Sequence, residues 1–238
     1  MRDLELASIA LERVLVVGAH PDDAEFSAGG LCAELVDRGV EVHLLVCTDG
    51  GRGGRGLEDA INVRASEQQA AAREIGFAHV QNLGHPDGEL QDDEVLRAEL
   101  VRVIREKRPD LVLAHDPRTL WRRFGWRSYL GHSDHRASGE AVLNAIYPRA
   151  TSPNFYREQL AAGLEPWYPQ RLWLFDTAEP DLRVRIGAGL DRKLRALARH
   201  ESQRASAGGL VEAARSVAKR MGEGAEPAEV FVELELRR

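Results

Sequence analysis

The sequence lacks a long apolar run: no stretch approaches the roughly 18 consecutive apolar residues that a membrane-spanning helix requires. Its first ten residues also lack the basic-then-apolar pattern of an export signal and instead carry two acidic side chains. These two absences predict a protein that works in the cytoplasm without contact with a membrane.

Cysteine is scarce: Cys32 and Cys47 are the two cysteines among 238 residues. Cys32 falls in a predicted helix and Cys47 in a predicted strand. Reduced cysteine usually packs as a small apolar side chain, which is the role that we expect for both. The sequence therefore does not indicate a disulfide framework.

An excess of basic charge is also absent. The chain has 32 lysines and arginines against 38 aspartates and glutamates, and these charges are spread along the whole sequence. Binding to nucleic acid requires a basic stripe that this distribution does not provide. The apolar content of 43% is typical of a globular protein with a core. We predict one domain, residues 1–238, that binds a small polar molecule. Assembly into a homo-oligomer is compatible with the sequence.

Apolar runs alternate with segments of helical periodicity in the first half of the chain. The predicted strands there are 13–18, 41–47, 79–83 and 110–114, and the predicted helices are 27–38, 61–75 and 93–107. This alternation predicts an α/β fold, a single-domain Rossmann-like open sheet that is mostly parallel and has helices on both faces. Further along we predict helices at 137–147 and 190–200 and strands at 171–176 and 231–236.

The first predicted strand leads directly into a polar segment, Ala-His-Pro-Asp-Asp-Ala-Glu at 19–25. It delivers His20, Asp22 and Asp23 to the carboxyl end of a strand, where open α/β sheets bind their ligands. Adjacent residues in a turn point in different directions, so one carboxylate can bind a cation while the other stays free as a base. The alternative is a solvated turn in which an aspartate caps the next helix.

A second polar segment, Gly-His-Ser-Asp-His at 131–135, precedes the predicted helix 137–147. His132 and His135 are three residues apart at the entrance of that helix, so both can face one site. Alone, this pair is weak evidence for a metal site, because histidines also occur on protein surfaces or as hydrogen-bonded residues of the core. Its position after the fourth predicted strand favours a role in the same crevice.

Together the two segments offer the donors of a hydrolytic zinc site, which takes three nitrogen or oxygen ligands and leaves a further position open. Two histidines and one carboxylate are one established set. One carboxylate and one histidine then remain for proton transfer and for stabilising an oxyanion. A nucleotide-binding Rossmann domain is disfavoured, since His-Pro-Asp-Asp stands where glycines would admit a pyrophosphate.

The two segments resemble the signatures of the LmbE-like or PIG-L-like N-deacetylases, a family that includes enzymes that de-N-acetylate glucosaminyl-inositol and related conjugates. Residues 19–25 are similar to the first signature and residues 131–137 to the second, although the family more often has proline where Ser133 stands. The resemblance covers roughly residues 13–205 and includes Arg64, Glu67, Pro86-Asp87-Gly88 and His200-Glu201-Ser202-Gln203.

The resemblance implies that His20, Asp23 and His135 hold a zinc ion, with iron and cobalt left open as the physiological metal. It also implies that Asp22 is the general base for the water that attacks the amide.

The resemblance further implies that His132, as a protonated ring, stabilises the oxyanion, and that Asp134 orients this ring or favours its charged form. Arg64 would contact a polar part of the substrate. Asp87 is a second expected substrate contact, because its turn follows the third predicted strand, although Pro-Asp-Gly is also an ordinary turn sequence.

Segment 121–129, with Arg118 just before it, places aromatic residues and arginines ahead of the second motif. Such side chains stack on sugar rings and clamp anionic groups. We predict either a lid over the site or a contact with a neighbouring subunit.

Other polar residues carry weaker signals. His115 and Asp116 end the fourth predicted strand. Each can either contact the substrate or support the residues that do, and the sequence does not distinguish these roles. His85 is expected on the surface, and His200 and Gln203 are expected to be structural.

The sequence thus predicts a metal-dependent hydrolase that removes an N-acyl group, most simply acetyl, from a small molecule containing an amino sugar. Two alternatives stay open. One is an amidase for a larger thiol conjugate or acylated natural product, which only the shape of the pocket would separate. The other is a non-catalytic zinc-containing protein that binds sugars, which would not need both Asp22 and His132.

Overall fold

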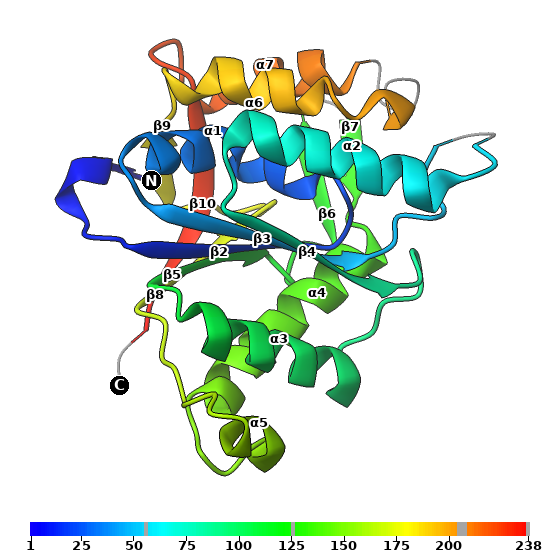
Figure 1. Cartoon of the computed structure of the whole chain (residues 1–238). Helices are drawn as coiled ribbons and strands as arrows, with labels where there is room; N and C mark the ends of the chain where they lie inside the picture. The colour runs from blue at the N-terminus through cyan, green and yellow to red at the C-terminus, as the bar shows by residue number, and fades with distance from the viewer. Residues whose placement is uncertain (55–56, 125–126, 204–208, 237–238) are drawn as a thin grey trace.

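The computed structural model describes residues 1–54, 57–124, 127–203 and 209–236, and these residues fold around one eight-stranded sheet (Figure 1). The strands of this sheet are β1 (Arg2–Leu4), β2 (Arg13–Gly18), β3 (Glu41–Thr48), β4 (His79–His85), β5 (Leu111–His115), β8 (Arg171–Phe175), β9 (Leu182–Arg185) and β10 (Ala228–Glu235). Their order across the sheet is β1-β9-β10-β8-β5-β2-β3-β4.

The sheet is mostly parallel, as predicted. β8, β5, β2, β3 and β4 each run parallel to the next, and β1 runs parallel to β9. β10 is antiparallel to both β8 and β9. Because β8, β5 and β2 are neighbours and point the same way, their carboxyl ends lie side by side at one edge of the sheet.

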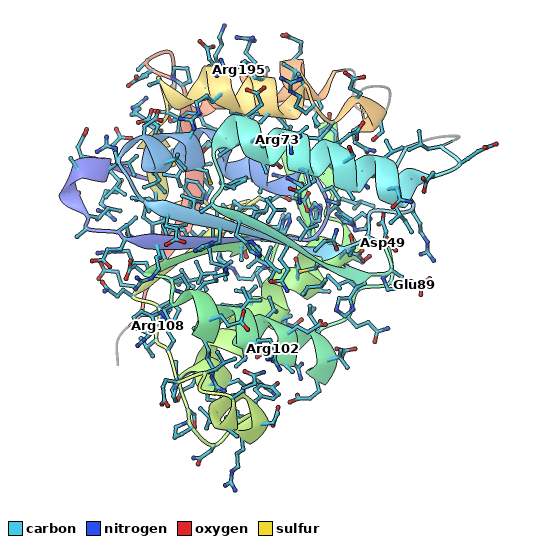
Figure 2. The ribbon with its side chains drawn as sticks, viewed as in Figure 1. Asp49, Arg73, Glu89, Arg102, Arg108 and Arg195 are labelled. Carbon is cyan, nitrogen blue, oxygen red and sulfur yellow. The ribbon has the colours of Figure 1, made fainter. Side chains whose placement is uncertain are left out.

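Helices cover both faces of the sheet, which confirms the predicted layering (Figure 1). One face carries α1 (Asp23–Asp37), α2 (Ala60–Ile75), α6 (Gly189–Leu197) and α7 (Leu210–Met221); the other carries α3 (Glu94–Lys107) and α4 (Ser133–Asn144), with the short α5 (Arg157–Ala161) beyond them. Arg73, Arg102 and Arg195 mark the exposed outer sides of α2, α3 and α6 (Figure 2). Within the described part of the chain, no helix combines the length and apolar character that crossing a membrane requires.

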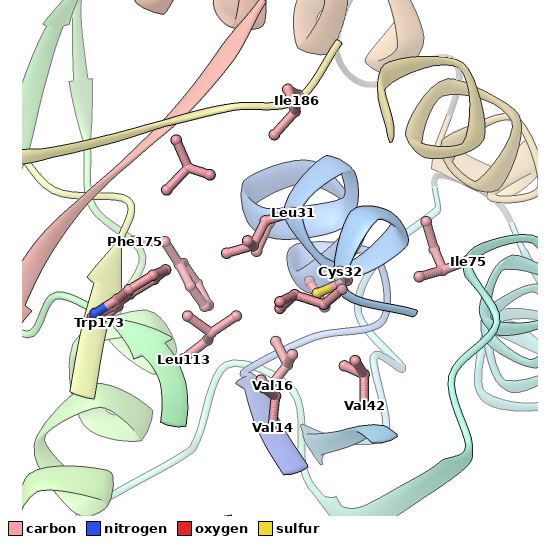
Figure 3. Close-up of a cluster of buried hydrophobic side chains, with 14 of the residues drawn as sticks. Val14, Val16, Leu31, Cys32, Val42, Ile75, Leu113, Trp173, Phe175 and Ile186 are labelled. Carbon is pink, nitrogen blue, oxygen red and sulfur yellow. The ribbon is translucent and has the colours of Figure 1, made fainter. Parts of the chain in front are cut away.

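β2 contributes to two hydrophobic clusters because alternate side chains of a strand point to opposite faces. Val14 and Val16 belong to the cluster that packs against α1 (Figure 3), whereas Leu15 and Val17 belong to the cluster beneath α3 and α4. Burial on both faces explains the continuous apolar run of this strand. Cys32 lies in the first cluster and Cys47 in the second, and both are buried free thiols, as expected.

Two helices begin earlier than predicted. α1 starts at Asp23 and α4 at Ser133, so residues of both polar motifs form the first helical turns. At α4 the ring of His132 caps the helix by accepting the N–H of Asp134 at Nδ1. Periodicity misses these starts because polar residues in a first turn add nothing to the apolar repeat. Helix geometry therefore sets the side-chain directions of Asp23, Asp134 and His135, for which the sequence predicted loops.

Several elements were not predicted at all. They include β1, β9, α7 and a hairpin formed by β6 (Trp121–Phe124) and β7 (Arg127–Leu130). β1 and β9 have three and four residues, too few for an alternating pattern to be visible. The hairpin occupies the segment for which a lid or a subunit contact was predicted. Residues 125–126 of that segment lie outside the described residues.

The packing of α1 against the segment that leads into α6 depends on Gly30. A Cβ atom at this position would lie 2.9 Å from the Cβ atom of Ile186, closer than packed carbon atoms tolerate. We predict that Gly30→Ala lowers the free energy of unfolding by about 1–3 kcal/mol, because overpacking outweighs the better helix propensity of alanine. Urea unfolding followed by circular dichroism measures the change. Gly29→Ala is the matched control, since its Cβ would meet Lys193 Cγ at 3.2 Å, and an equal loss in both variants would contradict the packing argument.

Candidate metal centre

Polar side chains gather where three neighbouring parallel strands end. His20 follows β2, His115 is the last residue of β5, and Asp176 follows β8. The first turns of α1 and α4 add Asp23 and His135. Segments far apart in the sequence therefore meet at the ligand-binding edge of the sheet.

His20, Asp23 and His135 form a group whose donor atoms all lie within 4.8 Å of one another. Nε2 of His135 lies 3.3 Å from Oδ1 of Asp23, and the ring centroids of His20 and His135 are 5.3 Å apart. The two motifs thus converge as a shared metal site requires. Among the described residues, two further groups have donor atoms this close together: His20, Asp87 and His132, and His115, His135 and Asp176.

The two oxygens of the Asp23 carboxylate have different partners. Oδ2 accepts the backbone N–H of His20 at 2.7 Å and lies 3.0 Å from Nε2 of His115. Oδ1 is the oxygen that faces His135. Burial alone would raise the pKa of Asp23, but the rings of His135 and His115 lower it well below its ordinary value. Asp23 is therefore ionised, as a metal ligand must be.

Nearby carboxylates hold protons on the rings of His20 and His135. Burial alone would lower both pKa values, but Asp23 and Asp87 raise the pKa of His20 to about 10, and Asp23 and Asp176 raise that of His135 to about 9. A site that stabilises two positive rings carries the negative charge that a bound cation needs. Since imidazole binds metals in its neutral form, a divalent cation would replace these protons. The donors and the charge both fit such an ion.

Asp22 stands immediately before α1 in a backbone conformation that residues other than glycine rarely adopt, with φ of 108°. Its N–H donates to Oε1 of Gln68 at 3.1 Å, and a guanidinium nitrogen of Arg64 lies 3.4 Å from its Oδ2. Burial raises the pKa of Asp22 to about 6, and the charge of Asp23 adds to this rise while Arg64 opposes it. Asp22 therefore exchanges its proton close to neutral pH.

His132 lies at the open side of the cluster, with 46% of its side chain exposed. Its ring centroid is 4.6 Å from that of His20 and 5.4 Å from that of His135. Burial, followed by the positive rings of His20 and His135, lowers the pKa of His132. A neutral ring whose Nδ1 accepts a backbone N–H carries its own proton on Nε2. The geometry thus favours a neutral donor rather than the protonated ring that the sequence led us to expect.

Asp134 orients His132 through its backbone N–H, and its carboxylate favours the charged form of that ring only at longer range. Its Oδ1 is 3.9 Å from Nδ1 of His132, beyond hydrogen-bond distance. Its Oδ2 accepts the N–H of Gly88 at 2.7 Å and lies 3.3 Å from Nε2 of His20. The contact with His132 runs through the backbone N–H of Asp134 instead. The fully buried Asp134 side chain therefore braces His20.

Arg64 and Asp87, both expected to contact substrate, lie beside the cluster and have partners within the chain. Arg64 is buried and donates to the carbonyl oxygens of Pro21 at 2.7 Å and Gly50 at 2.9 Å. Asp87 lies 3.2 Å from Nε2 of His20, and this contact lowers its pKa to about 2. Each side chain is placed to shape the site, and contact with a substrate stays a prediction.

His115 and Asp116, whose roles the sequence left open, differ in their contacts. His115 is buried, contacts Asp23, and stacks on His135 with ring centroids 3.9 Å apart. Asp116 pairs with the guanidinium of Arg118 at 2.8 and 2.9 Å. His115 thus braces two candidate ligands from behind.

Asp176 was missed in the sequence. Its Oδ2 lies 3.2 Å from Nδ1 of His135, and its Oδ1 pairs with Arg122 of β6. Burial would raise the pKa of Asp176, but hydrogen bonds with His115 and His135 hold it well below its ordinary value. The available signal was its position at the end of a predicted strand, 171–176.

The remaining histidines lie apart from the donor group. His200 is buried, with Nε2 3.7 Å from Oε2 of Glu25, and Glu25 accepts a hydrogen bond from Gln68 at 2.6 Å. This chain of contacts supports Gln68 and, through it, the backbone of Asp22. Nε2 of His85 lies 2.7 Å from Oε2 of Glu99.

An open α/β sheet with two imidazoles and a carboxylate converging at its strand ends defines an α/β protein with a candidate metal site. Residues 15–146 match the family described as PIG-L, GlcNAc-PI de-N-acetylase. The chain belongs to this PIG-L (LmbE-like) family.

Relatives of known description agree with this assignment. The chain is 36% identical to a diacetylchitobiose deacetylase of Thermococcus kodakarensis over 198 residues, which cover 81% of this chain and 70% of the relative. Its fold matches the N,N'-diacetylchitobiose deacetylase of Pyrococcus horikoshii with a TM-score of 0.83 and 29% identity, over 94% of this chain and 84% of that one. It also matches GalB, the 4-carboxy-2-hydroxymuconate hydratase of Pseudomonas putida KT2440, with a TM-score of 0.76 at 21% identity, over 95% of this chain and 98% of that one. This last likeness concerns the fold alone.

The raised pKa of Asp22 predicts a cost in stability. Because the folded-state pKa of about 6 exceeds the ordinary value of 3.8, ionisation of Asp22 destabilises the fold progressively between these two pH values. In protein stripped of metal with a chelator, we expect Asp22→Asn to raise the free energy of unfolding by about 1–2 kcal/mol near pH 8 and by much less near pH 4. Urea unfolding at both pH values measures this. A gain that does not depend on pH would contradict the assigned cause.

Proposed function

We propose that this protein is a zinc-dependent N-deacetylase that removes acetyl from the nitrogen of a small molecule containing an amino sugar. The observation that carries the proposal is the meeting of three candidate ligands with two further groups suited to amide hydrolysis. His20, Asp23 and His135 are the proposed ligands, and Asp22 and His132 lie beside them.

The donor set favours zinc, although iron and cobalt take similar ligands. A bound zinc ion would polarise the amide carbonyl and acidify a water molecule. His20 would bind it with Nδ1, which lies 3.5 Å from Oδ2 of Asp23, and His135 with Nε2. Asp87 and Asp134 would stay in contact with Nε2 of His20. Carboxylates behind both rings are the usual support of histidine ligands.

Asp22 is the proposed general base. A carboxylate with a pKa near 6 is ionised at neutral pH, yet basic enough to accept the proton of the attacking water. The same proton can then pass to the amine that leaves, which completes hydrolysis of the amide. Arg64 and Gln68 keep the carboxylate and its backbone in place during both transfers.

His132 is the proposed donor to the oxyanion. Its exposed ring stands at the open side of the site, and the N–H of Asp134 fixes its orientation through Nδ1. Nε2–H is then free to donate to the oxygen that becomes negative when water attacks the carbonyl. This role does not require a positive charge on the ring.

The proposed substrate class follows from the relatives, since the fold alone does not fix the reaction. A family described by GlcNAc-PI de-N-acetylase and a relative named diacetylchitobiose deacetylase share N-acetylglucosamine as the reacting unit. Arg64 and Asp87 are the proposed contacts to the hydroxyl groups of such a sugar, because both border the donor group.

Asp22→Asn tests the base. We expect amine release from N-acetylglucosamine and N,N'-diacetylchitobiose to fall at least about a hundredfold, because the attacking water loses its proton acceptor. Metal content, measured by elemental analysis, should stay that of the unaltered protein, and a chelator should abolish the activity of the unaltered protein. Unchanged amine release in the variant would exclude Asp22 as the base. A zinc-loaded protein that releases no amine from any N-acetylated sugar would favour the non-catalytic alternative.

His132→Ala tests the oxyanion donor. Loss of one such donor costs about 3 kcal/mol in other hydrolases, so we expect kcat to fall by about a hundredfold or more with zinc still bound. His85→Ala is the control, because His85 pairs with Glu99 away from the donor group, and it should leave kcat unaltered. Full activity of His132→Ala would remove this residue from the mechanism.

A further inference from the structure

Asp176 connects the β6–β7 hairpin to the candidate metal centre. Its Oδ2 lies 3.2 Å from Nδ1 of His135, and its Oδ1 forms an ion pair with Arg122 of β6. Each oxygen of the carboxylate thus has a partner of its own. One partner is a proposed zinc ligand, and the other belongs to a hairpin that is separate from the eight-stranded sheet.

The contact with Asp176 determines which nitrogen of His135 is available to a metal. A neutral imidazole has one N–H and one lone pair. When Nδ1–H donates to a carboxylate, the lone pair is on Nε2. In this structure Nε2 points into the donor group and lies 3.3 Å from Oδ1 of Asp23. Asp176 therefore favours the tautomer and the ring orientation that zinc requires.

His115 restricts the same ring from its face. The rings of His115 and His135 stack with centroids 3.9 Å apart and an interplanar angle of 24°. His115 is itself fixed by its contact with Oδ2 of Asp23 at 3.0 Å. The ring of His135 thus has a stacking partner on its face and a hydrogen-bond partner in its plane, so removal of Asp176 would take away the contact that selects its tautomer.

Arg122 fixes Asp176 in turn. Asp176 adopts a left-handed backbone conformation with φ of 60°, just beyond the end of β8. Its side chain is 12% exposed, so an opposite charge is needed to offset its burial. Arg122, whose own side chain is 26% exposed, provides that charge from β6. The orientation of the carboxylate therefore depends on a residue outside the main sheet.

We propose that Asp176 and Arg122 are positioning residues that set the zinc affinity of the site through His135. The inference rests on the metal site proposed above but not on the reaction. Carboxylates behind histidine ligands commonly change metal affinity by about 10- to 100-fold. Here the carboxylate is in addition paired with a cation, so the strength of zinc binding is tied to the position of the hairpin.

The test measures zinc dissociation constants by competition with a chromophoric chelator. We expect Asp176→Ala to weaken zinc binding by about 10- to 100-fold and Asp176→Asn to weaken it less, since an amide oxygen still accepts from Nδ1–H. Arg122→Ala should weaken binding by about tenfold or less, because it acts one contact further away, and Arg122→Lys should recover part of this loss. Urea unfolding shows whether each variant is folded before zinc is added.

The control is Arg123→Ala. Arg123 neighbours Arg122 on β6, but its guanidinium lies over the ring of Trp121, 5.4 Å from the centroid. It should leave zinc affinity unchanged. A second readout is the visible absorption of cobalt-substituted protein, whose bands should shift in Asp176→Ala, because His135 loses the carboxylate on Nδ1, and stay in place in Arg123→Ala.

Failure of this inference and failure of the proposed function give different results. Asp176→Ala that binds zinc as tightly as the unaltered protein, with the same cobalt spectrum, would overturn the positioning role while leaving the deacetylase proposal standing. Tight zinc binding that Asp176→Ala weakens, in a protein that releases no amine from N-acetylated sugars, would support the positioning role and contradict the reaction. Absence of zinc binding in the unaltered protein would overturn both.

Discussion

The buried carboxylate of Asp23 is the interaction on which the rest of the site depends. It joins the end of β2, the end of β5 and the first turn of α4, because His20, His115 and His135 all contact its two oxygens. A buried carboxylate without partners is costly, so these contacts must form together. The parallel order of β8, β5 and β2 makes this possible, since it brings their carboxyl ends to one place. The order of the strands in the sheet therefore determines which side chains can surround Asp23.

The sequence was sufficient to predict that His20, Asp23 and His135 meet, and insufficient to find Asp176. The first three stand in two dense polar motifs at strand and helix ends, and a general rule places such ends at one edge of a parallel sheet. Asp176 is the last residue of the predicted strand 171–176 and has no polar motif around it. Its contact with His135 depends on β8 lying next to β5, which a strand prediction does not supply. Assignment of a role to each motif residue depended on the family resemblance rather than on spacing.

Asp134 illustrates a second limit of sequence reasoning. The family resemblance implied that Asp134 orients His132 or favours its charged form, whereas in the first turn of α4 its carboxylate contacts Gly88 and His20. Its backbone N–H, exposed at the helix start, meets His132 instead. The start of α4 one helical turn earlier than predicted therefore places Asp134 in the first turn of the helix, where its side chain and its backbone N–H have different partners. Side-chain direction, rather than residue identity, was the part that could not be predicted.

The adjacent residues Asp22 and Asp23 show how the fold gives two identical side chains different chemistry. The left-handed backbone of Asp22 places its carboxylate beside Arg64 and outside the cluster of rings, so burial dominates and its pKa rises to about 6. Asp23, one residue later in the helix, is surrounded by His115 and His135, which lower its pKa. When the environments of two carboxyl groups give them different pKa values, the group with the higher pKa commonly transfers protons and the other stays charged. The strained backbone of Asp22 stands where the chain turns into α1, so the separation of the two carboxylates is built into the start of that helix.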